Sequence, residues 1–516
     1  MKYPIGIQNF ESLRTDGYDY VDKTELVYKL VSEGRYYFLS RPRRFGKSLL
    51  LSTLKAYFEG KRELFDGLAI ANLEQEWKQY PVLHLDLNTR QYSSRESLIA
   101  ELSKHLEIWE SEYGIDYRDR SVEERFFQCI YHAARQSEVG KVVILVDEYD
   151  KPLLETIGNP ELQEEYRQIL KAFYANIKSC DEYIRFAFLT GVTKFSHLTI
   201  FSGLNNLNDI SLDEQYADIC GITQEELETV FHEGVDLLSA KMKQSRSEIL
   251  SELKRSYDGY HFSSNTDIAV YNPFSVINAL SKGRISPFWF GTGTPSFLAE
   301  VLRRSDYPIY QISAEGVKAN AMDSLDVLDT DPIPLLFQSG YLTIKGYDAR
   351  FDSYRLGFPN AEVESGFVQF LAAYYHTGDG NGNFAIDQFV RDVENGDVEG
   401  FMTRLQSFYA DSDYQLTGKL EVYFQNSLMT IFKLMGFYTQ VERHTSRGRM
   451  DVTIQTSDYI YIMELKVDKS ADEALQQIED KQYALPFAAD KRKLFKVGVS
   501  FGSKTRCIDE WKVVEG

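Results

Sequence analysis

The segment at residues 36–58 constrains the fold more than any other part of the chain. An apolar, β-rich run at Tyr36–Ser40 leads into Arg41-Pro-Arg-Arg-Phe-Gly-Lys-Ser48, and an apolar helical pattern follows at residues 49–58. A strand, a short loop and the start of a helix bring backbone N–H groups together with the positive end of the helix dipole, which attracts anions. This order predicts a phosphate-binding loop in an α/β sheet.

Two side chains of this loop carry the chemistry expected of it. Lys47 is expected to reach the β- and γ-phosphates of a nucleotide, and Ser48 to place its hydroxyl on Mg²⁺. The usual pattern has glycine where this chain has Arg41, which is a departure. The other loop residues expected to line the phosphates are Arg43, Arg44, Phe45 and Gly46.

A second apolar run, at residues 142–146, ends in two carboxylates. Asp147 suits coordination of Mg²⁺ and Glu148 suits the polarising of an attacking water. The alternative is that Asp147 only caps the next helix. Thr190 and Lys194, after a further apolar run, are candidates for sensing the γ-phosphate or are simply a polar turn. The loop and the acidic strand end together predict ATP binding with hydrolysis.

Several sequence blocks resemble those of the bacterial AAA-ATPase-like family. Members of that family commonly pair this ATPase domain with a C-terminal PD-(D/E)XK nuclease-superfamily domain, and an arginine at the first loop position also matches the family. The resemblance covers most of the chain and implies its architecture. The blocks are Tyr20-Val-Asp-Lys-Thr24, Leu39 to Leu49, Val146-Asp-Glu-Tyr-Asp-Lys-Pro152, Asn205-Asn-Leu-Asn-Asp-Ile-Ser211 and Tyr257-Asp-Gly-Tyr-His-Phe262.

A second cluster of charged residues lies near the C-terminus. Residues 448–454 and 459–467 have the pattern of two strands joined by a turn, and Glu464 and Lys466 project from the same face of the second strand. A hairpin would bring Asp451 close to them. Clustered carboxylates are costly unless a cation binds, and Mg²⁺ prefers oxygen ligands. Lys466 would orient or deprotonate the attacking water. The alternative is an exposed strand with alternating charges.

Two predicted helices flank these strands. Glu421 begins a helical pattern at residues 421–432 and is placed to join the metal site. A helix at residues 474–483 resembles the one beside the active site in this nuclease superfamily, and it carries Gln477 and Tyr483. Ordinary packing is the alternative for Gln477 and Tyr483. The resemblance implies catalytic roles for Asp451, Glu464, Lys466, Glu421 and Gln477, with Asp451 and Glu464 as the metal ligands.

Composition limits the choice of location and partners. The longest apolar stretches are strand-sized, and the N-terminus lacks the apolar core of a signal peptide, so a cytoplasmic protein without a membrane span is expected. The four cysteines are scattered, and the histidines lack metal-ligand spacing. A net charge of −20 argues against a surface coated for nucleic acid. Two basic segments, at residues 443–449 and 491–496, are either a local groove or solvated surface.

A chain of 516 residues is expected to form several domains. We expect an α/β P-loop parallel-sheet ATPase core at residues 1–210, a helical or mixed region at 211–375, with helices at 225–239 and 247–257, and an α/β restriction-endonuclease-like domain at 376–516. The predicted function is an ATPase whose nucleotide state controls a magnesium-dependent nuclease acting on nucleic acid, DNA more than RNA. A non-cleaving nucleotide switch and an ATPase that remodels a protein partner are the alternatives. A homo-oligomer is left open.

Overall fold

A computed structural model of the chain describes most of its residues. The residues outside the description are 1, 195–205, 266, 291–297, 299–316, 319–321, 323–330, 378–384, 411–419, 437–439 and 447–448. The side chains at 373–377, 420–426, 440–446 and 449–451 also lie outside it. Among the described residues, two compact units can be distinguished, one ending at Glu364 and the other beginning at Ser365. The expected domain limits stay predictions.

A five-stranded parallel sheet forms the centre of the first unit, in the order β2-β3-β4-β1-β5. Every residue of β1 and β3 is buried, which explains why their sequences are continuously apolar. The carboxyl ends of all five strands meet at one edge, and this edge carries the candidate nucleotide site. The strands are β1 (Tyr36–Ser40), β2 (Val82–Asp86), β3 (Val142–Asp147), β4 (Ile184–Gly191) and β5 (Asn208–Asp209).

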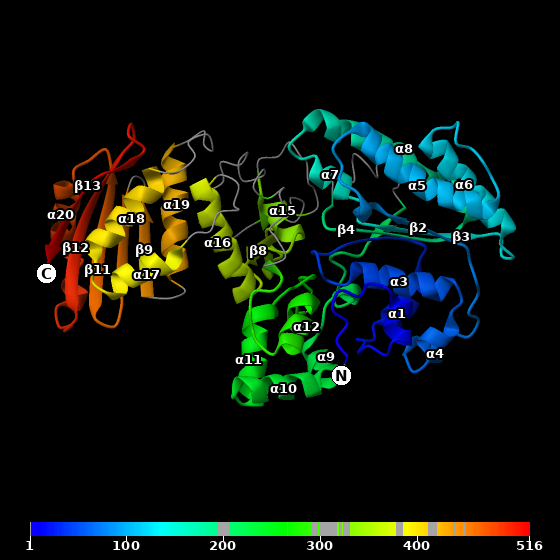
Figure 1. Cartoon of the computed structure of the whole chain (residues 1–516), viewed down its shortest axis with the longest axis horizontal. Helices are drawn as coiled ribbons and strands as arrows, with labels where there is room; N and C mark the ends of the chain where they lie inside the picture. The colour runs from blue at the N-terminus through cyan, green and yellow to red at the C-terminus, as the bar shows by residue number, and fades with distance from the viewer. Residues whose placement is uncertain are drawn as a thin grey trace. The chain divides into compact units, whose positions relative to one another are not determined.

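Helices cover both faces of this sheet. Figure 1 shows α5, α6 and α8 on one side of the strands and α1 and α3 on the other. The predicted α/β ATPase core is therefore confirmed. The helices of this part are α1 (Phe10–Thr15), α2 (Thr24–Glu33), α3 (Lys47–Phe58), α4 (Ile70–Leu73), α5 (Arg95–Tyr113), α6 (Val122–Gln136), α7 (Lys151–Glu155) and α8 (Pro160–Ser179).

A helical region follows the sheet within the same unit. The helices between residues 224 and 282 pack around a core that includes Leu227, Phe231 and Tyr257. The helix expected at residues 225–239 is two helices, because Phe231 leaves the helical conformation and is buried in that core. The helices are α9 (Gln224–Val230), α10 (His232–Met242), α11 (Arg246–Tyr257), α12 (Pro273–Lys282) and α15 (Ile333–Gln338).

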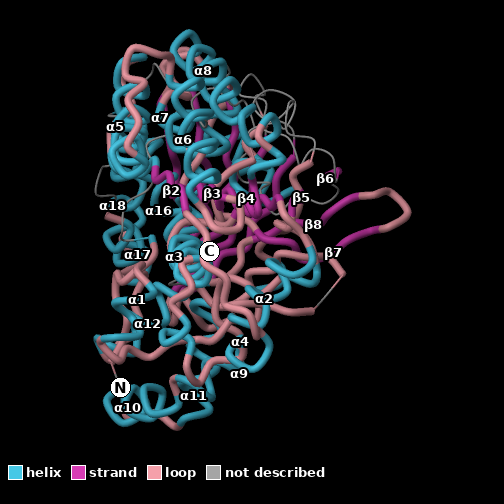
Figure 2. The backbone as a smooth tube through the Cα atoms, turned by 90° about the vertical axis from the view of Figure 1, so that its right-hand side faces the viewer, coloured by secondary structure: helices cyan, strands magenta, loops and turns pink. Residues whose placement is uncertain are grey.

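A small antiparallel sheet, in the order β6-β8-β7, completes the first unit. Its strands are β6 (Val317–Lys318), β7 (Thr343–Asp348) and β8 (Ser353–Gly357). The β7–β8 hairpin projects outward in Figure 2. The helix α16 (Ala361–Thr377) begins in the first unit, and its residues from Ser365 onward belong to the second.

The second unit is built on a five-stranded mixed sheet in the order β13-β12-β11-β10-β9. β11 and β12 are parallel and α20 connects them, whereas the other neighbours are antiparallel. This confirms the expected α/β domain, although the sequence analysis missed β9 and β13. The elements are α17 (Ile386–Glu394), α18 (Val398–Ala410), α19 (Leu420–Met435), β9 (Gln440–Ser446), β10 (Arg449–Gln455), β11 (Tyr459–Val467), α20 (Ala471–Asp480), β12 (Lys493–Gly502) and β13 (Cys507–Glu515).

No helix among the described residues combines the length and apolar character needed to cross a bilayer.

Candidate functional site

The predicted phosphate loop lies between the end of β1 and the start of α3. Gly46 precedes the helix with φ of 93°, a left-handed conformation that glycine adopts without strain. A Cβ at this position would meet nothing within 4 Å, so the loop has open space beside Gly46. Ser48 is half-buried in the first turn, whereas Arg43 and Arg44 are exposed. The start of α3 thus presents backbone N–H groups beside open space, as an anion site requires.

Lys47 is buried, and polar groups surround its ammonium group. Its Nζ donates hydrogen bonds to the carbonyl oxygens of Arg41 and Pro42, at 3.0 and 3.3 Å. It also lies 3.4 Å from Oε1 of Glu148. The lysine and the glutamate that the sequence assigned to one site are therefore in contact.

The acidic end of β3 lies at the same edge of the sheet. Asp147 is buried, and its Oδ1 accepts hydrogen bonds from the hydroxyl of Thr190, at 2.7 Å, and from the backbone N–H of Glu148, at 3.0 Å. The next helix, α7, has Asp150 and not Asp147 at its N-cap position. The alternative that Asp147 caps the N-terminus of the next helix is therefore excluded. Glu148 itself has φ of 51°, a strained backbone conformation for a residue other than glycine.

Asp150 is a buried carboxylate that the sequence analysis did not single out. It accepts hydrogen bonds from the backbone N–H and the hydroxyl of Thr193, both at 2.6 Å, and from the N–H of Val192. Burial, followed by the negative charge of Glu148, raises the pKa of Asp150 to about 6. Gly191 makes this approach possible, because a Cβ there would lie 2.5 Å from Oδ1 of Asp150. Asp150 thereby ties the segment after β3 to the end of β4.

Arg41, which replaces the usual glycine, is a structural anchor. Its side chain is almost completely buried, and it donates hydrogen bonds to the carbonyl oxygens of Ser211, at 2.7 Å, and Tyr216, at 3.1 Å. The guanidinium lies 4.0 Å from the ring centroid of Phe262. Burial lowers the pKa of Arg41 to about 10. The departure from the motif therefore has a physical role that the motif alone did not indicate.

The two residues proposed to sense the γ-phosphate have different surroundings. Thr190 holds Asp147, as described above. The ammonium of Lys194 is buried and forms an ion pair with Asp209 on β5, at 2.7 Å. Its backbone N–H donates to Oε1 of Gln338, also at 2.7 Å. Thr190 is therefore hydrogen-bonded to the acidic end of β3, whereas Lys194 is ion-paired with β5.

An apolar cavity of about 100 Å³ lies beside the loop. One wall is the N-terminal segment that contains Tyr20 and Val21, a second is the first turn of α3 with Leu49, and a third is the helical region with Ile222 and Pro273. Gly46 also lines this cavity, so it adjoins the phosphate loop.

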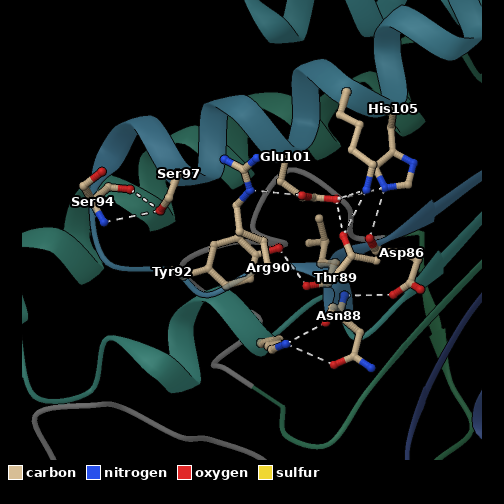
Figure 3. Close-up of polar contacts among 12 residues, drawn as sticks. Asp86, Asn88, Thr89, Arg90, Tyr92, Ser94, Ser97, Glu101 and His105 are labelled. Atoms are coloured by element: carbon tan, nitrogen blue, oxygen red, sulfur yellow. Dashed lines mark hydrogen bonds and ion pairs between the residues drawn. The ribbon is translucent and has the colours of Figure 1, made fainter.

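A polar network at the end of β2 completes this edge of the sheet, and Figure 3 shows it in close-up. Asp86 lies next to Asp147 in the register of β2 and β3. Behind it, the buried carboxylate of Glu101 accepts hydrogen bonds from the hydroxyl of Thr89 and from Lys104. Burial alone would raise the pKa of Glu101, but these partners bring it below its usual value. Sequence reasoning missed this network, which holds the loop after β2.

The second candidate site lies on β10 and β11. Asp451 pairs with Glu464 in the antiparallel register of these strands. The side chains of Asp451 and of Glu421, on α19, lie outside the described residues. Glu464 is fully buried and Lys466 is 8% exposed. The alternative interpretation, an exposed strand with alternating charges, is therefore wrong. Among the described residues no group of three or more side chains has metal-ligand geometry.

Gln477 belongs to this second site. It projects from α20, and its Nε2 donates a hydrogen bond to Oε1 of Glu464 at 2.5 Å. Tyr483 follows the end of α20 and packs against a small core of Ile460, Ile462 and Ile478. Gln477 thus contacts the acidic strand, while Tyr483 has the packing role that was its alternative.

The basic segment at residues 491–496 is largely neutralised. Arg492 pairs with Asp490 at 2.7 Å, Lys493 with Glu515 at 2.7 Å, and Lys496 with Glu479 at 2.5 Å. It therefore has the character of solvated surface. The side chains of the other segment, at 443–449, lie outside the described residues.

Comparison with known protein families identifies an N-terminal ATPase part and a C-terminal nuclease-superfamily part. Residues 4–201 match a family model described as a predicted AAA-ATPase, and residues 419–511 match one described as the PD-(D/E)XK nuclease superfamily. A protein of Azotobacter chroococcum mcd 1, named "Uncharacterized protein in vnfD 5'region", is 35% identical over 521 residues, which cover 98% of each chain. The chain therefore belongs to the AAA-ATPase-like family whose members carry a C-terminal domain of the PD-(D/E)XK nuclease superfamily.

Proposed function

We propose that the first unit binds and hydrolyses ATP with Mg²⁺, and that its nucleotide state controls a magnesium-dependent phosphodiesterase in the second unit that acts on DNA or RNA. The observation that carries the first half is the convergence of Lys47, Glu148 and Asp147 at the carboxyl edge of one parallel sheet. In parallel α/β sheets, ligands bind at this edge.

The residues at this edge suit a nucleotide with its metal. The start of α3 offers backbone N–H groups, and Lys47 offers a cation, to the phosphates. Ser48 and Asp147 offer hard oxygen ligands of the kind that Mg²⁺ prefers. The bound ion would supply charge neutralisation at the phosphates. Lys47 would exchange its contacts with the loop carbonyls and Glu148 for contacts with phosphate oxygens, since all these partners are oxygens.

Glu148 then has a defined role. Released from Lys47, its carboxylate would accept a hydrogen bond from the attacking water and polarise it. Thr190 holds Asp147 by a hydrogen bond of 2.7 Å and so keeps the second carboxylate oriented. The apolar cavity that includes Gly46 and Leu49 would receive the base. These roles make ATP hydrolysis the chemistry that the first site supports best.

The second unit supports phosphodiester cleavage. Asp451 and Glu464 are aligned on neighbouring strands, and their carboxylates would hold Mg²⁺, to which Glu421 could add a third. The metal would supply a Lewis acid at the phosphate. Lys466 would orient the attacking water, and Gln477 would orient Glu464 through its hydrogen bond. Burial of Glu464 favours the arrangement, because a buried carboxylate is costly unless a positive charge balances it.

ATP binding and turnover by the wild type and two variants test the first half of this proposal. Wild type, Lys47→Ala and Glu148→Gln would be compared by thermal unfolding with ATP and Mg²⁺, because a ligand that binds the folded state raises the melting temperature. We expect a shift for wild type and Glu148→Gln, little shift for Lys47→Ala, and ATP turnover by wild type alone. The absence of any ATP-dependent shift in wild type would refute nucleotide binding.

A further inference from the structure

The residues of the phosphate loop before Gly46 are held by contacts from outside the loop. In an ordinary phosphate loop, glycines let the backbone N–H groups turn toward the anion. Here Arg41 takes the place of the first glycine, residues 42–45 all carry bulky side chains, and only Gly46 retains that freedom. A loop of bulky residues needs other contacts to fix its backbone. These contacts come from the helical region of the same unit, 211–364.

Phe45 is fixed by two aromatic rings of the Tyr257–Phe262 block. Its ring centroid lies 4.7 Å from that of Tyr260 and 5.6 Å from that of Phe262, both edge to face. Phe262 also stacks beneath the guanidinium of Arg41. Aromatic pairs of this geometry contribute beyond the area they bury. The block that the resemblance singled out thus packs directly on the phosphate loop.

Close backbone approach fixes the next residue. Gly340, which follows α15, has φ of 90°, and a Cβ there would lie 2.6 Å from Cβ of Pro42. Only glycine permits this approach. The loop is therefore in van der Waals contact with the helical region at Pro42 as well as at Phe45.

Trp289 contacts the backbone of the loop at Arg43, an exposed loop residue. Its indole N–H donates to the carbonyl oxygen of Arg43 at 3.0 Å. Trp289 is itself fixed, because its backbone N–H donates to Oε1 of Glu362 at 2.7 Å. Glu362 lies in the first turn of α16, and it also accepts a hydrogen bond from Ser275 at 2.7 Å. An immobilised donor therefore sets the orientation of the Arg43 peptide.

We propose that Trp289 is a positioning residue for ATP: its indole hydrogen bond to the Arg43 carbonyl, together with the Tyr260 and Phe262 rings on Phe45, holds the phosphate loop in its binding conformation. This inference rests on the proposed binding of ATP by the loop. Trp289 touches the loop backbone and acts through it. Because the backbone N–H of Trp289 also donates to Glu362 in α16, Trp289 connects the phosphate loop to the helical region through two hydrogen bonds.

Trp289→Phe tests this role, because it removes the indole donor and keeps an aromatic ring. Trp511→Phe is the matched control: its indole donates to a carboxylate of Glu399, also at 3.0 Å, in the second unit. We expect Trp289→Phe to raise the dissociation constant for ATP, measured by titration calorimetry, about three- to tenfold, the effect of losing one hydrogen bond. Trp511→Phe should leave that constant unchanged.

A comparison of KM with kcat separates positioning from a general loss of structure. If Trp289 acts on binding alone, Trp289→Phe should raise KM for ATP in the same proportion and keep kcat at saturating ATP. Equal dissociation constants for folded Trp289→Phe and wild type would overturn the inference and leave ATP binding intact, as would a lower kcat with unchanged KM. Failure of wild type to bind ATP would overturn the proposed function and this inference with it.

A second variant covers the case in which Trp289→Phe does not fold. Tyr260→Leu removes the ring edge from Phe45 and retains an apolar but shorter side chain. We expect the same rise in the dissociation constant. An unchanged constant in folded Tyr260→Leu would likewise overturn the inference.

Discussion

Replacement of Arg41 by glycine, the residue of the usual motif, gives opposite predictions from motif and structure. A motif-based view expects Arg41→Gly to improve phosphate binding. The structure predicts damage, because the variant leaves the buried carbonyls of Ser211 and Tyr216 without their donor. Glycine also adds backbone freedom to a loop that the Arg41 side chain anchors.

The size of the effect follows from the two hydrogen bonds to the helical region. Hydrogen bonds from a charged donor contribute about 1.5–3 kcal/mol each. The cost of burying the guanidinium opposes this, so the lower value applies and the loss is about 3 kcal/mol. For a unit of this size, that corresponds to a melting temperature lower by roughly 4 °C. Arg41→Lys keeps the charge but lacks the two-sided fork, and should lose about half as much.

Tryptophan fluorescence measures this loss in the first unit alone. The chain has four tryptophans, and three of them, Trp77, Trp109 and Trp289, lie in the first unit. In a Trp511→Phe background the signal therefore reports that unit. Unfolding by denaturant, with and without ATP, would be followed for Arg41, Arg41→Lys and Arg41→Gly. Equal or higher stability of Arg41→Gly, or tighter ATP binding, would refute the anchoring role.

Three further predictions concern single carboxylates and the lysine of the second site. The pKa of Asp150 is about 6 in the folded chain, above its ordinary value of 3.8, so the contribution of Asp150 to stability is complete below pH 3.8 and is lost as the pH rises through 6. Relative to Asp150→Asn, the free energy of unfolding of the wild type should therefore fall over that interval. A constant difference between the two proteins would contradict the raised pKa. Glu148→Gln removes the anionic partner of Lys47 and should bind ATP at least as tightly as wild type in calorimetry; weaker binding would mean that Glu148 contacts the nucleotide. Lys466→Ala should retain Mg²⁺ or Mn²⁺ binding, measured as metal-dependent thermal stabilisation, and should reduce nucleic-acid cleavage at least a hundredfold. Asp451→Asn should weaken both metal binding and cleavage. If neither variant changed either property, the role of β10 and β11 would be structural.

The sequence predicted those parts of the fold and sites that depend on local pattern. The buried strands β1 and β3 are apolar up to their last residues, so Lys47, which follows β1, and Asp147, which ends β3, could be assigned to one nucleotide site. Glu464 and Lys466 share a strand face because they are two residues apart, and side chains alternate between the two faces of a strand. Gln477 came from the resemblance of its helix to the one beside the active site in the nuclease superfamily, and it does contact Glu464.

The remaining features depend on contacts between distant residues. Trp289 meets Arg43 across 246 positions of sequence, and no local pattern links them. Arg41 resembles a defect in a motif until its partners Ser211 and Tyr216 are located. β13 was missed because many of its residues are exposed or half-buried, so it lacks the apolar run that marked the inner strands.

The central claim is that nucleotide state in the first unit controls cleavage by the second. The direct measurement is the initial rate of cleavage of plasmid, single-stranded DNA and RNA in Mg²⁺, with no nucleotide, ADP, ATP or a non-hydrolysable ATP analogue, for wild type, Lys47→Ala and Lys466→Ala. Ligands shift a conformational equilibrium only when they bind its states differently. We predict that the wild-type rate changes with nucleotide, that Lys47→Ala cleaves at one nucleotide-independent rate, and that Lys466→Ala does not cleave. Identical wild-type rates in all four nucleotide conditions would contradict the coupling, and the absence of wild-type cleavage on every substrate would contradict the nuclease.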